Sequence, residues 1–156
     1  MEELLTAVIG FAIFGVIIYY KAQKKGKLMG EGLIRERTGS FDREAIIFTT
    51  SVDFVKLWNK LNGMEYNTTT YYKLSQNSHT VNYNGARWEG ILREVGKSED
   101  KYRYQFNFTT WQTQYGKNTE TVEMNLFLTS LEKAFLSLDP EVSVEKRLLK
   151  VKSKLF

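Results

Sequence analysis

The sequence predicts an α+β fold, in which an antiparallel sheet carries helices on one face, a single transmembrane helix precedes it and a basic tail follows. Three patterns predict this fold: an uncharged apolar run at the start, apolar–polar alternation in the middle, and helical spacing on both sides of that alternation. The length of 156 residues fits one domain with a small appendage. The absence of cysteine excludes disulfides, iron–sulfur clusters and cysteine-based zinc sites.

The apolar run covers residues 4–20 and contains no charged side chain. A helix of this length is at the short end of what a bilayer core needs, and Tyr19 and Tyr20 would lie at the interface. A buried helix of a soluble domain and a cleaved signal peptide are the alternatives. The signal peptide is disfavoured because Glu2 and Glu3 precede the run and no small-residue cleavage site follows.

A basic cluster directly follows the apolar run, at Lys21, Lys24, Lys25 and Lys27. Positive charge beside a membrane helix tends to stay in the cytoplasm. We therefore expect a single-pass membrane protein with its N-terminus outside and its domain in the cytoplasm. Residues 1–25 form the anchor with its basic flank, and residues 26–43 form a polar, glycine-rich linker.

The domain itself is expected at residues 44–138, in the order strand, helix, four-strand meander, helix. Residues 44–50 predict the first strand, and Thr50 or Ser51 is expected to cap the helix that follows. The meander strands are expected at 70–83, 86–95, 102–108 and 122–128, and Asn84-Gly85 predicts a tight hairpin. Thr129 and Glu132 have the spacing of a capping box that opens the last helix.

The strand at 102–108 has the clearest alternation in the chain. Tyr102, Tyr104, Phe106 and Phe108 alternate with polar residues, which predicts that the aromatic side chains form the core face. These and other aromatic residues of the meander could instead line a cavity for an apolar ligand. Packing within the core explains them more simply.

Residues 139–156 form a basic tail with two possible conformations. Asp139-Pro140-Glu141 is a typical helix start, and an apolar stripe follows it at Val144, Leu148, Val151 and Leu155. We expect an amphipathic helix suited to an anionic membrane surface or a partner groove. The alternative is a final edge strand protected by its lysines.

The sequence contains no motif for catalysis or cofactor binding. No glycine pattern for phosphate binding is present, and the single histidine, His79, is expected at the surface. Glu89 and Glu94 would face opposite sides of a strand and form no catalytic pair. We therefore predict no catalytic, cofactor or metal site. Nucleic acid binding is also not expected, because the net charge of +4 comes from the two ends of the chain.

These patterns predict a membrane-anchored, non-enzymatic accessory or adaptor domain on the cytoplasmic face of a membrane protein assembly. The alternative is a membrane-anchored module that holds an apolar or lipid-like ligand between sheet and helix. The residues expected to contact the membrane or a partner are the basic ones near the two ends: Lys21, Lys24, Lys25, Lys27, Lys146, Arg147, Lys150, Lys152 and Lys154.

Overall fold

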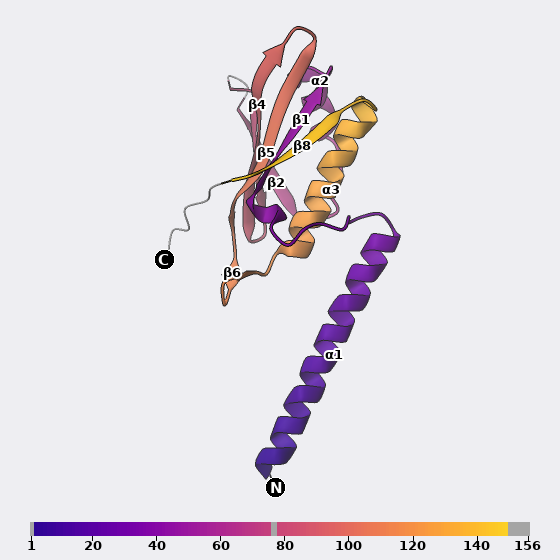
Figure 1. Cartoon of the computed structure of the whole chain (residues 1–156), viewed down its shortest axis with the longest axis vertical. Helices are drawn as coiled ribbons and strands as arrows, with labels where there is room; N and C mark the ends of the chain where they lie inside the picture. The colour runs from indigo at the N-terminus through magenta and orange to yellow at the C-terminus, as the bar shows by residue number, and fades with distance from the viewer. Residues whose placement is uncertain (1, 76–77, 150–156) are drawn as a thin grey trace. The chain divides into compact units, whose positions relative to one another are not determined.

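The computed structural model of the chain describes residues 2–75 and 78–149, with side chains from Ala12 onward. The chain divides into two compact units, Met1–Glu36 and Arg37–Phe156. The first unit consists of helix α1 (Glu2–Gly30) and the turn after it, where Gly32 has a positive φ of 67°. The second unit contains the sheet and the remaining helices (Figure 1).

The first unit corrects the prediction of a single-pass membrane protein. In the part of the chain that the structure describes, no helix combines the length and the hydropathy needed to cross a membrane. Helix α1 begins at Glu2. The helix then continues through the lysines to Gly30, inside the segment 26–43 expected to be a linker. The absence of such a helix among these residues contradicts the predicted single-pass localisation, with its N-terminus outside and its domain in the cytoplasm.

The second unit is α+β, as predicted, and its sheet has six antiparallel strands in the order β2-β3-β4-β5-β1-β8. A short 3-10 helix, η1 (Phe41–Arg43), precedes the sheet, and β6 (Thr113–Gln114) pairs with β7 (Lys117–Asn118) in a separate small hairpin. The other elements are β1 (Glu44–Thr50), α2 (Phe54–Leu61), β2 (Thr70–Ser75), β3 (Thr80–Gly85), β4 (Trp88–Ser98), β5 (Lys101–Trp111), α3 (Thr121–Leu138) and β8 (Ser143–Leu148).

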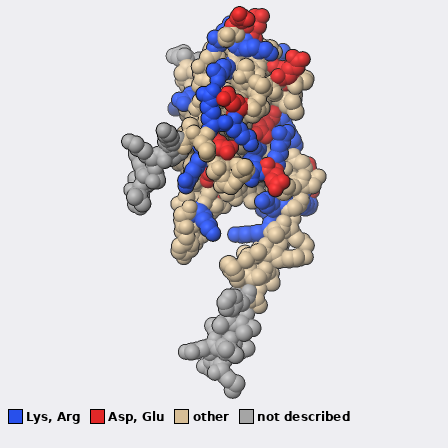
Figure 2. Space-filling model, in the orientation of Figure 1, with Lys and Arg blue, Asp and Glu red and all other residues tan. Residues whose placement is uncertain are grey.

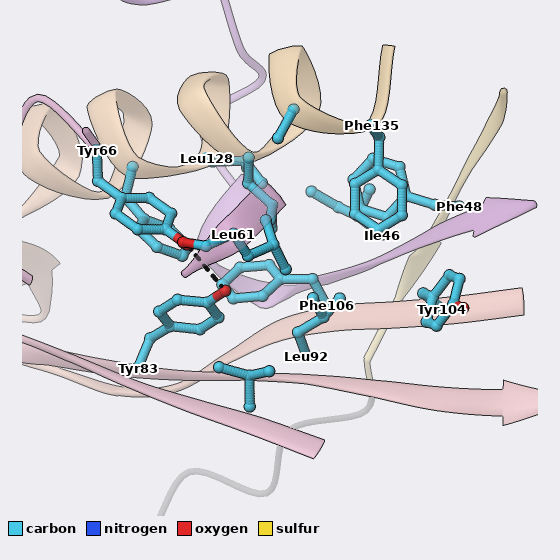
Figure 3. Packing of buried hydrophobic residues seen from close by; sticks show 14 of the residues in the cluster. Ile46, Phe48, Leu61, Tyr66, Tyr83, Leu92, Tyr104, Phe106, Leu128 and Phe135 are labelled. Atoms are coloured by element: carbon cyan, nitrogen blue, oxygen red, sulfur yellow. Dashed lines mark hydrogen bonds between the residues drawn. The ribbon is translucent and has the colours of Figure 1, made fainter. Parts of the chain in front are cut away.

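Helices α2 and α3 pack on the same face of this sheet, and aromatic rings fill the layer between the sheet and the helices (Figure 3). Phe48 of β1 stacks on Phe135 of α3 with ring centres 4.0 Å apart. The hydroxyls of Tyr66 and Tyr83 lie 3.1 Å apart in a hydrogen bond within the same layer. Burial raises the pKa of Tyr66 from 10 to about 12.

The aromatic strand of the sequence analysis is β5, and its predicted core face is confirmed. Tyr104, Phe106 and Phe108 are buried, and Tyr102 is partly buried against the same cluster. Strand β1 begins and ends as predicted at residues 44–50. Asp53, rather than Thr50 or Ser51, caps α2, because its carboxylate accepts the Lys56 N–H at 2.9 Å.

The predicted first meander strand, 70–83, is a hairpin of two strands, β2 and β3. The predicted hairpin between β3 and β4 is present, but its turn lies at Ala86-Arg87, because Asn84 and Gly85 are the last residues of β3 and Asn84 pairs with Glu89. Glycine is required at position 85, because a Cβ there would lie 2.2 Å from the Trp88 indole.

The predicted strand at 122–128 is wrong, because these residues form the first half of α3, which begins at Thr121. Their apolar alternation does not mark a strand face, since every residue from Met124 to Glu132 is buried. The apolar residues of the helix pack against the sheet, and the polar residues of the helix are buried as well. A segment buried on more than one side loses the one-sided pattern that distinguishes a surface helix from a strand.

Arg37 explains why these polar residues of α3 are buried. Its guanidinium donates to Asn125 Oδ1 at 2.7 Å, to Thr129 Oγ1 at 3.1 Å and to both carboxylate oxygens of Glu132 at 3.0 Å. Thr129 and Glu132 are therefore not a capping box at a helix start. They lie inside α3 and bind Arg37, which belongs to the segment before β1. Its guanidinium forms a bidentate pair with the carboxylate of Glu132.

Asp139 ends α3 and connects it to the end of β1. Its N–H donates to the Phe135 carbonyl, and its carboxylate accepts the Thr50 hydroxyl at 2.6 Å and the Ser51 N–H at 2.9 Å. The predicted helix start at Asp139-Pro140-Glu141 is thus a helix end. The hydrogen bonds from Thr50 and Ser51 lower the pKa of Asp139 from 3.8 to about 2.

The first prediction concerns Asp139. Asp139→Asn should lower the free energy of unfolding at neutral pH by about 1–3 kcal/mol, because buried donors lose an ionised acceptor. The lowered pKa means that the carboxylate stabilises the fold above pH 4 and that this contribution is lost as the pH falls towards 2. Urea unfolding of both proteins between pH 7 and pH 2 should therefore give a difference that shrinks with acidification. The exposed Asp100→Asn is the control, and an equal pH profile for both variants would contradict the role of Asp139.

The second prediction concerns the core face of β5. Phe106→Ala should lower the free energy of unfolding by about 3–5 kcal/mol, since the ring is fully buried among other aromatic rings. Chemical denaturation of the full chain measures this loss. The matched control is Thr109→Ala, an exposed position on the same strand. Similar losses for the two variants would show that Phe106 does not lie on the core face of β5.

Candidate functional site

Strand β8 (Ser143–Leu148) is an edge of the six-stranded sheet and the most exposed strand in it. It pairs antiparallel with β1, with Val144 opposite Phe48 and Arg147 opposite Ala45, and all six of its residues are exposed. The predicted helix is therefore wrong for residues 143–148, and the alternative of an edge strand is confirmed there. The tail residues Lys150, Val151, Lys152, Lys154 and Leu155 lie outside the described part of the chain.

The structure gives a physical reason for the strand. Asp139 closes α3 and also accepts the Glu141 N–H at 3.0 Å, which turns the chain back towards β1. Within the described chain, β1 has β5 on one side and β8 on the other, so β8 satisfies the second row of its backbone groups. The stabilisation from these backbone hydrogen bonds is greater than the stabilisation that an amphipathic helix with the same apolar residues would provide.

The backbone of β8 presents hydrogen-bonding groups at its outer edge. The Leu149 N–H donates to the Arg43 carbonyl at 2.9 Å, so this residue points towards the β1 side. Successive residues of an antiparallel strand point their N–H and C=O groups to opposite neighbours. The groups of Val144, Lys146 and Leu148 therefore point away from β1. No other strand of the described residues pairs with this edge.

The side chains of β8 differ between its two faces. Glu145 and Arg147 lie on the face opposite the core and form an ion pair with Nε and Oε1 3.0 Å apart. This arginine lowers the pKa of Glu145, with a smaller contribution from Arg103 of β5, 4.0 Å away. Val144 and Leu148 lie on the other face and are 47% and 72% exposed. One face thus offers the ion pair of Glu145 and Arg147, and the other offers two apolar side chains with Lys146 between them.

Two of the nine predicted contact residues belong to this edge, Lys146 and Arg147. Lysines and arginines are prominent over the sheet in Figure 2, with acidic residues among them. The four lysines of α1 lie in the first unit and are exposed. Of these, Lys27 lies 3.9 Å from Glu31 in an exposed ion pair, which adds little to stability. The basic character that the sequence analysis emphasised is only part of the β8 surface, because Glu145 complements Arg147.

His79 and Glu94 form a second polar cluster, which the sequence analysis missed. The His79 Nδ1 lies 2.8 Å from Glu94 Oε2, and the imidazole stacks on Phe54 with ring centres 4.6 Å apart. A catalytic histidine also needs a nucleophile or substrate group on its other side. The neighbouring Ser78 hydroxyl instead bonds to Ser75 Oγ at 3.0 Å, and no hydroxyl of the described residues donates to His79. Among the described residues, Glu94 and the Phe54 ring orient the imidazole of His79.

The layer between the sheet and α3, where an apolar ligand was the alternative expectation, contains closely packed rings. Phe127 lies 4.7 Å from Tyr83, 4.8 Å from Trp88 and 5.1 Å from Tyr66, measured between ring centres. These rings contact one another at the distances of ordinary aromatic packing. Among the described residues, no cluster of three His, Asp or Glu side chains could hold a metal ion.

Comparison with protein-family profiles, with curated proteins and with solved structures finds no match to this chain. The residue that the sequence analysis missed at the edge is Glu145. Its signal was present, because Glu145 and Arg147 are two residues apart and share a face if the segment is a strand. Interpreting the segment as a helix places them on different sides and hides the pair.

The third prediction tests the strand and its orientation through amide hydrogen exchange. The N–H groups of Glu145 and Arg147 point to β1 and should exchange slowly, whereas those of Val144, Lys146 and Leu148 should exchange fast. Exchange of the full chain at low micromolar concentration, followed by NMR, measures this alternation. A helix would protect consecutive amides to similar degrees, and that result would contradict the strand.

Proposed function

We propose that this chain is a non-enzymatic accessory or adaptor domain, which binds a partner polypeptide by accepting one of its strands along β8. The observation that carries the proposal is the outer edge of β8, where the backbone groups of Val144, Lys146 and Leu148 point away from the sheet. An extended segment that pairs there becomes a seventh strand. Backbone hydrogen bonds supply affinity in this mode of recognition, and alternate side chains supply specificity.

The side chains at the edge define which segment fits. On the core side, Val144 and Leu148 flank Lys146, which favours apolar residues on either side of a polar or acidic one. On the other side, Glu145 and Arg147 favour a basic and an acidic residue in the order that places each opposite its counter-charge. A strand with both patterns would gain contacts on both faces of the sheet.

The opposite edge of the sheet, β2, supports this role less well. Its only charged residue is Lys73, and it offers no ionic pattern that a partner could complement. An apolar ligand between sheet and helix is also less supported, because the rings around Phe127 contact one another. Strand addition at β8 needs no rearrangement of the core.

The fourth prediction tests strand addition in living cells of the source organism. A photo-crosslinking amino acid in place of Leu148, which is 72% exposed, should give a discrete protein adduct whose crosslinked peptide is an extended segment. Adding Lys146→Pro should remove the adduct, because proline lacks the outward N–H while the bonds between β8 and β1 remain. Mass spectrometry identifies the adduct and the crosslinked peptide.

The matched control places the same amino acid at Lys73 on β2. Adducts that are equally abundant from both edges, or that persist after Lys146→Pro, would show that contact at β8 is unspecific. A complete absence of adducts from position 148 would contradict the proposed function.

A further inference from the structure

The residues of β8 are symmetric about Lys146 in a way that no other strand of the described chain shows. Glu145 and Arg147, of opposite charge, flank this residue, and Val144 and Leu148, both apolar, come next on either side. A two-fold axis through position 146 would bring each flanking residue opposite its complement in a second copy. Two identical patches that meet in this way form an isologous interface.

The geometry of an antiparallel pair restricts the registers that a second copy can adopt. Directly opposite residues share a face of the sheet, so Glu145 can lie opposite only the partner's Ser143, Glu145 or Arg147. Residues that point outward must also meet residues that point outward, which pairs Val144, Lys146 and Leu148 among themselves. The register centred on position 144 satisfies both conditions but gives Glu145 no charged residue opposite it, which leaves the three registers centred on the charged residues.

The charges choose among these three registers. Centring on position 145 places Glu145 opposite the partner's Glu145, and centring on position 147 places Arg147 opposite the partner's Arg147. Centring on position 146 gives two ion pairs, each between Glu145 of one copy and Arg147 of the other. The same register gives two apolar pairs, each between Val144 and Leu148. Its cost is a single pair of like charges at Lys146, whose long side chains can separate in solvent.

We infer that β8 pairs antiparallel with the β8 of a second copy of this chain, with Lys146 opposite the partner's Lys146. The inference rests on the proposed function, because it names the strand that the β8 edge accepts. The two six-stranded sheets then form one continuous sheet across the two-fold axis. The ion pair between Glu145 and Arg147 within each copy becomes part of a four-residue network.

The backbone geometry agrees with this register. Lys146 and Val144 would each form a hydrogen-bonded pair, with the partner's Lys146 and Leu148 respectively. Glu145 and the partner's Arg147 would form the pair without mutual backbone bonds, in which the side chains approach most closely. One paired strand buries less surface than a permanent dimer, so the association should be weak and dependent on concentration.

The fifth prediction tests the register directly with single cysteines, which is possible because the chain has no cysteine of its own. Lys146→Cys should form an interchain disulfide, since paired Cα atoms lie about 5.5 Å apart, within the range that a disulfide bridges. Glu145→Cys and Arg147→Cys should crosslink at least about tenfold more slowly, because each lies opposite a different residue and beyond the reach of about 7 Å. Mild oxidation of the full chain and non-reducing electrophoresis measure the rates.

Charge reversal supplies a second test that does not depend on cysteine. Glu145→Arg and Arg147→Glu should each weaken self-association, measured by sedimentation, by at least about tenfold. A mixture of these two variants should associate again, because all four charges are then paired with opposite ones. Restored association of the mixture shows that each variant folds, since an unfolded chain could not pair.

The outcomes separate this inference from the proposed function. Fastest crosslinking at position 145 or 147, or a mixture that fails to associate, would overturn the register. Absence of crosslinking at all three positions would overturn self-pairing. The photo-crosslinks from position 148 would then decide whether β8 binds a different protein, so the proposed function could stand without this inference.

Discussion

The carboxylate of Asp139 is the interaction on which the arrangement of the second unit depends. It joins the last turn of α3 to the end of β1, where it accepts hydrogen bonds from Thr50 and Ser51. This contact sets where the helix ends and where the chain turns. The turn delivers β8 alongside β1, in the register that pairs Val144 with Phe48. The exposed edge of β8, and every function proposed for it, therefore depends on the buried, hydrogen-bonded carboxylate of Asp139, which precedes this strand in the chain.

A second buried polar group explains why α3 could be mistaken for a strand. Arg37 binds Asn125, Thr129 and Glu132 on the side of the helix that would otherwise face solvent. The side chain of this arginine is 4% exposed, and a buried charge is tolerated only when it is paired and hydrogen-bonded. Polar residues of α3 are therefore buried as well as apolar ones. The sequence pattern that normally identifies a surface helix is absent for that reason.

The elements that sequence reasoning predicted correctly are those whose pattern is local. In β5 the aromatic residues alternate because one face meets the core, and β1 is a compact β-branched and aromatic run with clear limits. The position of β8 depends instead on pairing with β1, about a hundred residues away along the chain, and no local pattern records it. Lys146 and Arg147 were selected for their charge, while Glu145 was overlooked because a helix would not place it beside Arg147. For α1, the apolar run at its start predicts a membrane span, whereas no helix of the described residues combines the length and hydropathy of one.

An exposed edge strand must avoid unspecific pairing and still accept its proper partner. A lysine in the middle of an edge strand opposes pairing with an arbitrary strand, because its charge would be buried against apolar residues. Lys146 occupies this position in β8, with Glu145 and Arg147 on either side. These two residues favour only a strand that carries opposite charges at the matching positions, and their own strand is one that does. In the proposed pairing, the same three side chains would discourage general aggregation and favour one register, so that a weak interface would be selective.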